Sequence, residues 1–206
     1  MTRDATFRTE RLTSLNSETT RMAAGDSESP LGYLSLVQPR ESVFVGGLLL
    51  TTRRGRPLEF HCTTPVSANE TQRVLYGRTL PGYLCGDVIA SALLKKASGR
   101  PGLIFLDDDA ALDAREHSGC PVAVLLDDGL APAATLAEPA DSAERGTTTR
   151  SAADFDLGPL RLRVHSGYLE DVGQIRSLDL DPDFDLGEPL QRVREALGQT
   201  VRGEAA

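Results

Sequence analysis

Two short apolar runs constrain the fold more than any other feature of this sequence. They comprise residues 102–106 and residues 121–126, and each ends in consecutive aspartates. A stretch with the pattern of a short helix, residues 110–117, separates them. Strands that are apolar throughout are typical of parallel sheets buried on both faces, and a helix commonly connects such strands. The two runs therefore predict a parallel βαβ pair.

A β-hairpin is predicted upstream of this pair. Residues 43–51 are β-branched, aromatic and apolar, and residues 58–63 alternate between apolar and polar side chains. Residues 53–57 between them are typical of a turn, with a glycine that accepts positive φ. Gly46 and Gly47 interrupt the first strand, which indicates a bulge or the close approach of another backbone or a ligand.

The remaining periodic segments complete an α/β fold with a mixed sheet of about five strands. The N-terminal β-hairpin is followed by helices and the parallel βαβ pair, with helices on both faces of the sheet. A capping box at Ser67 and Glu70 predicts the start of the first helix. The other expected elements are a short strand at 33–37, helices at 67–76 and 83–97, a strand at 160–165, a short helix around 169–175 and a final helix at 189–197.

The chain divides into four parts by composition. Residues 1–30 are polar and lack apolar periodicity, so we expect them to be disordered. Residues 31–130 contain the predicted α/β core. Residues 131–153 are rich in Ala, Pro, Glu, Ser and Thr and are interpreted as a flexible linker or a long loop. Residues 154–206 are expected to form a strand-helix-helix extension that packs on the core.

Charge and cysteine content limit the partners and the compartment. The formal net charge of −8 disfavours direct binding to nucleic acid, because phosphate backbones repel an acidic surface. No stretch approaches the roughly 20 apolar residues of a membrane helix, so no membrane association is expected. Three widely spaced cysteines favour free thiols in a reducing cytoplasm. Cysteine and histidine lack paired ligand spacing, and no zinc or other cofactor is expected.

Carboxylates at the ends of the two apolar runs form one candidate site. If the runs are parallel neighbours, Asp107, Asp108, Asp127 and Asp128 lie at the same edge of the sheet, where open α/β sheets bind ligands. Carboxylate oxygens suit Mg²⁺, which could support hydrolysis or phosphoryl transfer. The alternative is structural, because an aspartate commonly caps a helix and Asp-Asp-Gly is a common turn. No Gly-rich phosphate loop accompanies the cluster.

The hairpin forms a second candidate site, for interaction with a protein partner. Its edge is a template for strand addition. Phe44 and Phe60 are two of only six phenylalanines, and we expect both to be important for the core. Alternatively, the arginine-rich turn is simply solvated and the hairpin is covered by helices of its own chain. The candidate interaction residues are Phe44, Gly46, Gly47, Arg53, Arg54 and Arg56.

Three functions remain open from the sequence, and no motif is specific enough to indicate a family. The favoured interpretation is a non-catalytic subunit or protein-interaction module of a larger cytoplasmic assembly, with at least one protein partner. The alternative is a magnesium-dependent hydrolase or phosphoryl-transfer enzyme that uses the four aspartates. A third interpretation is a sensor domain that binds a small ligand over Gly46 and Gly47.

Overall fold

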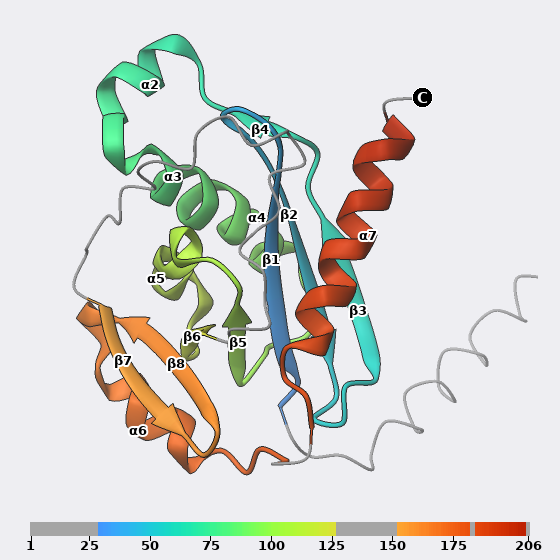
Figure 1. The fold of residues 1–206 in the computed structure, drawn as a ribbon, viewed down its shortest axis with the longest axis vertical. Helices are drawn as coiled ribbons and strands as arrows, with labels where there is room; N and C mark the ends of the chain where they lie inside the picture. The colour runs from blue at the N-terminus through green and yellow to red at the C-terminus, as the bar shows by residue number, and fades with distance from the viewer. Residues whose placement is uncertain (1–28, 127–151, 182–183, 205–206) are drawn as a thin grey trace, which may run out of the picture.

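A mixed β-sheet runs through the whole molecule (Figure 1). The computed structural model describes residues 29–126, 152–181 and 184–204. Within these residues, eight strands form the sheet in the order β3-β2-β1-β5-β6-β8-β7, with β4 paired to β2 outside this path. The sheet confirms the predicted α/β class, with more strands than expected. The strands are β1 (Leu31–Arg40), β2 (Val43–Thr51), β3 (Pro57–Cys62), β4 (Val66–Ser67), β5 (Leu103–Leu106), β6 (Val122–Leu125), β7 (Ala152–Leu157) and β8 (Leu160–His165).

The predicted parallel pair and the predicted hairpin are joined by β1. Strands β5 and β6 are parallel, as the apolar runs indicate, and β2 and β3 are antiparallel. β1 lies between these units, antiparallel to β2 and parallel to β5. It extends over ten residues rather than the five expected at 33–37. Pro39 lies within the longer strand, where the β1–β2 register shifts between Val37 and Arg40, an irregularity that tolerates a missing N–H.

Helices cover both faces of the sheet and create two hydrophobic cores. Alternating residues of β1 serve the two cores: Tyr33 lies in the core under α6 and α7, and Leu34 in the core under η2, α4 and η3. None of the helices among the described residues is long and apolar enough to cross a membrane. The helices are α2 (Glu70–Tyr76), η1 (Gly77–Thr79), α3 (Leu80–Gly82), η2 (Tyr83–Ala90), α4 (Ser91–Lys96), η3 (Asp109–Ala114), α5 (Arg115–Ser118), η4 (Ser166–Tyr168), α6 (Glu170–Ser177) and α7 (Glu188–Glu204).

The expected capping box at Ser67 and Glu70 is wrong. Ser67 belongs to β4, where it pairs with Val43 of β2. The capping box lies two residues later: the Asn69 side chain accepts from the backbone N–H of Gln72 at 2.8 Å, and the Gln72 side chain accepts from the Asn69 N–H at 3.0 Å. The sequence therefore contains two possible capping boxes, Ser67 with Glu70 and Asn69 with Gln72. Because Ser67 pairs in β4, the helix begins at the second one.

The C-terminal part of the chain contributes to the same sheet. A β7–β8 hairpin joins it through antiparallel pairing of β8 with β6. β7 begins at Ala152, so the last two residues of the linker expected at 131–153 belong to a strand, and residues 131–151 lie outside the described residues. An ion pair also ties this part to the rest: Arg115 of α5 contacts the buried carboxylate of Asp171 in α6 at 2.7 and 3.0 Å.

Candidate protein interface

Asp107 follows β5 and lies at the carboxyl end of the parallel strands, as the sequence predicts. Its side chain is 1% exposed. Its Oδ2 accepts from the Ser35 hydroxyl of β1 and, at 2.7 Å, from Nε of Arg194 on α7. Burial raises the pKa of the Asp107 carboxyl, and the neighbouring Arg194 guanidinium acts in the opposite direction. The carboxylate thus connects α7 to the sheet.

The other aspartates of the predicted metal site do not join Asp107 in the part of the chain that the structure describes. Asp108 caps η3, where its Oδ1 accepts from the Ala110 N–H at 2.8 Å. Asp127 and Asp128 lie outside the described residues, so the magnesium site stays a prediction. Within the described ranges, no group of three or more His, Cys, Asp and Glu side chains could hold a metal ion.

Gly46 and Gly47 allow helices to approach β2 from both faces. A Cβ added to Gly46 would lie 2.2 Å from Cγ2 of Ile89 in η2, and one added to Gly47 would lie 2.9 Å from Cγ1 of Val193 in α7. The close approach that the sequence indicated is therefore made by side chains of the two covering helices. Phe44 is half-buried against the η2 side of the sheet.

The turn between β2 and β3 places its three arginines differently. Arg53 is half-buried and donates from Nη1 to the carbonyl oxygen of Asp179 at 2.8 Å. Arg54 and Arg56 are exposed, and neither side chain forms an ion pair with any residue that the structure describes. Gly55 between them is buried and adopts a φ of 75°, which an L side chain rarely adopts.

Strand β3 is an edge of the sheet, and no strand within the described ranges pairs with its outer side (Figure 1). The Thr63 N–H donates to the Gly46 carbonyl of β2 at 2.9 Å. Inward-facing and outward-facing backbone groups alternate along an antiparallel strand, so the backbone groups of Phe60 and Cys62 face away from β2. A second chain could form a ladder with these groups.

Glu59 holds β3 in place from the side opposite α7. Its carboxylate accepts from the backbone N–H groups of Ser98 and Gly99 at 3.0 and 3.2 Å, and contacts His61 Nε2 at 2.5 Å. The hydrogen bond from Ser98, followed by that from His61, lowers the pKa of Glu59 to about 2. The carboxylate is therefore ionised at neutral pH and connects the edge strand to the end of α4.

The expectation that Phe60 belongs to the core is wrong. Its side chain is 40% exposed, and the neighbouring Leu58 is 57% exposed. The cause is the position of β3 at the edge of the sheet, with α7 lying over β1 and β2. Pro57 pairs with Thr51 across a register shift, so regular pairing begins only after Leu58. Phe60 thus lies in the regularly paired part of the edge strand, and Leu58 lies at the irregularity beside it.

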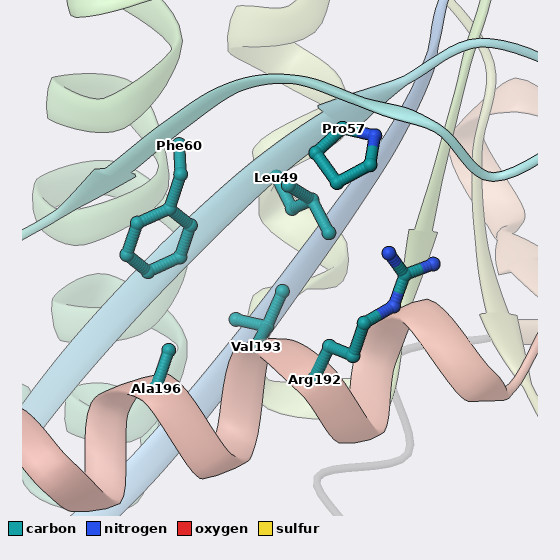
Figure 2. A pocket seen from close by; sticks show the side chains of 6 residues that line it. All are labelled: Leu49, Pro57, Phe60, Arg192, Val193 and Ala196. Carbon is teal, nitrogen blue, oxygen red and sulfur yellow. The ribbon is translucent and has the colours of Figure 1, made fainter.

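A groove of about 180 Å³ lies between β3 and α7 (Figure 2). Phe60 of the strand and Ala196 of the helix point toward each other across it. Arg192 stands at the end next to Pro57, where it pairs with Glu188 at 2.7 Å and donates to the Gly55 carbonyl at 3.0 Å. The lining residues are Leu49, Pro57, Phe60, Arg192, Val193 and Ala196.

Comparison with known proteins adds no functional information. The sequence matches no protein-family model, and no curated protein is significantly similar to it. The candidate interface therefore rests on its own geometry. The sequence prediction included the turn residues Arg53, Arg54 and Arg56. It missed Leu58, Phe60 and the α7 residues Arg192 and Ala196 as interface residues. Apolar spacing in the final helix was visible, but nothing in the sequence indicates that this helix lies beside β3.

Proposed function

We propose that this chain is a non-catalytic interaction module, a subunit of a larger assembly, which binds an extended segment of a partner protein along β3. The observation that carries the proposal is an open edge strand with exposed Leu58 and Phe60 beside an apolar groove. Natural proteins usually protect such edges, because exposed backbone groups and apolar side chains promote pairing with other chains. A partner segment would cover both.

The size of the groove supports a peptide rather than a small ligand. Small-molecule pockets typically enclose about 300–1,000 Å³ and are deeply concave, whereas this groove has about 180 Å³. It can receive one apolar side chain of a strand that pairs with β3. In strand addition, backbone hydrogen bonds provide affinity and pockets for alternate side chains provide specificity. The contact made by Glu59 keeps the edge strand in place before binding, which reduces the entropy lost on association.

The free cysteines support a cytoplasmic location for this assembly. Cys62, Cys85 and Cys120 all lie among the described residues, and none forms a disulfide. Cys85 is buried in the core under η2, where desolvation raises the pKa of its thiol. Reduced thiols of this kind are typical of a reducing compartment.

Site-specific photo-crosslinking in the native host tests the proposal. A photoreactive amino acid replaces Leu58 in one variant and Val74 in a control variant. Val74 is also apolar and 80% exposed, but it lies on α2, away from the β3 edge. We expect a covalent adduct at position 58, with the crosslinked peptide assigned by mass spectrometry to one segment of a different protein.

Three other outcomes would overturn this proposal. The absence of any adduct at position 58 would mean that β3 meets no partner in the cell. A crosslink to a second copy of the chain would make the edge a homodimer contact. An adduct at position 74 alone would place the partner on α2.

A further inference from the structure

The charge around the groove differs from the charge of the whole chain. The net charge is −8, yet the turn that precedes Pro57, at one end of the groove, carries the exposed Arg54 and Arg56, whereas Arg192 of the groove lining pairs with Glu188. Exposed charges of one sign attract a segment of the opposite sign and disfavour the wrong partner. The turn end of the edge strand is therefore a place where a partner of defined charge can be selected.

The acidic residues closest in sequence to α7 have contacts of their own. Asp185 accepts from the backbone N–H groups of Gly187 and Glu188 at the start of the helix, at 2.9 and 3.2 Å. Glu188 pairs with Arg192. Arg54 and Arg56 are exposed and have no ion pair within the described residues. Among the described residues of the turn, these two arginines are therefore available to a partner.

From this arrangement we propose that the segment bound along β3 is an acidic, extended peptide. It has apolar side chains at alternate positions and its carboxylates at the end that lies over Arg54 and Arg56. The alternation follows from strand pairing, since every second side chain of an added strand faces the groove side of the sheet. This inference rests on the proposed function and specifies the chemistry of the partner.

Selection from a random peptide library tests the inference with the 206-residue chain as bait. We expect wild type to enrich peptides with alternating apolar residues and with Asp or Glu gathered at one end. Two charge-reversed baits carry Arg54→Glu with Arg56→Glu, or Arg73→Glu with Arg78→Glu. The second pair matches the change in net charge, because Arg73 and Arg78 are exposed and lie in or beside α2.

The bait with Arg54→Glu and Arg56→Glu should bind a selected acidic peptide with a Kd on the order of tenfold higher than wild type, and it should enrich basic peptides instead. The α2 bait should behave as wild type. Loss of binding in both baits to the same extent would attribute the effect to net charge and overturn the inference. The inference would also be overturned if wild type bound peptides without preferring acidic ones and Phe60→Asp abolished that binding. This result would leave the proposed function intact. Enrichment of no peptide at all would instead contradict the proposed function.

Discussion

Phe60 and Phe105 are both strand residues, but the structure gives them opposite environments. Phe60 is 40% exposed at the edge, whereas Phe105 of β5 is fully buried and stacks on Tyr33 with ring centroids 5.5 Å apart. We expect Phe60→Ala to reduce the free energy of unfolding by about 1 kcal/mol. Phe105→Ala should reduce it by about 3–5 kcal/mol, because it leaves a cavity. Urea denaturation measures both, and equal losses would place Phe60 in the core.

Gly46 and Gly173 should respond oppositely to the same substitution. Gly46→Ala forces a methyl group against Ile89, and we expect it to destabilise the fold by about 1–3 kcal/mol through overpacking. Gly173 lies in α6, and beyond its own helix backbone and chain neighbours no described atom lies within 4 Å of an added Cβ. Gly173→Ala should stabilise by about 0.5–1 kcal/mol, because it removes the conformational cost of a helical glycine. Thermal unfolding of the two variants compares these effects, and a stable Gly46→Ala protein would disprove the close helix contact.

The attachment of β3 to the end of α4 should depend on pH. The unfolded Glu59 has a pKa near 4.5, and folding lowers it to about 2. A lowered folded pKa stabilises the protein above the unfolded value, and this contribution is lost as the pH falls through about 2. Wild type should therefore melt at a higher temperature than Glu59→Gln at pH 7, and the gap should close between pH 4.5 and pH 2. A gap that is constant with pH would exclude the carboxylate as its source.

The docking of α7 depends on the ion pair between Asp107 and Arg194. Arg194→Leu leaves the buried Asp107 carboxylate without its counter-ion, and we expect a loss of about 3–5 kcal/mol. The double variant Asp107→Leu with Arg194→Leu should lose less than Arg194→Leu alone, because no buried charge remains unpaired. Denaturant titrations of the single and double variants form the mutant cycle. Simple additivity of the two losses would show that the residues do not interact.

Local patterns in the sequence were sufficient to predict individual elements but not the position of each in the sheet. The parallel pair follows from two continuous apolar runs, the hairpin from an apolar run and an alternating run around a turn, and the C-terminal helix from a period of 3.6 residues. The edge position of β3 follows instead from the order of the strands in the sheet: β1 lies between β2 and β5, and its pairing with β5 is non-local. For this reason Phe60 was misplaced in the core, although its strand was found. The groove could not be predicted for the same reason, because it forms only where α7 lies beside the edge strand.

The Arg115–Asp171 ion pair joins the C-terminal part of the chain to the helices that cover the other hydrophobic core, the one that contains Leu34. Asp171 is fully buried, and the Arg115 guanidinium also stacks over the Tyr168 ring at 4.2 Å. We expect Arg115→Ala to cost about 3–5 kcal/mol, since it leaves the Asp171 carboxylate unpaired. Hydrogen exchange should accelerate more in α6 than in β2, because the contact that is lost lies at α6. Uniform acceleration along the sheet would instead indicate that the molecule opens only as one unit.

The order of strands along the chain also has a consequence for biosynthesis. The parallel partner of β1 is β5, whose residues are translated about seventy positions later, and α7 follows β1 to β8 along the chain. Until the ribosome has released α7, Val45, Leu49 and their neighbours on that face have no covering helix. The nascent chain thus carries both an uncovered apolar face and an unpaired strand edge during elongation, the features that attract chaperones and promote aggregation.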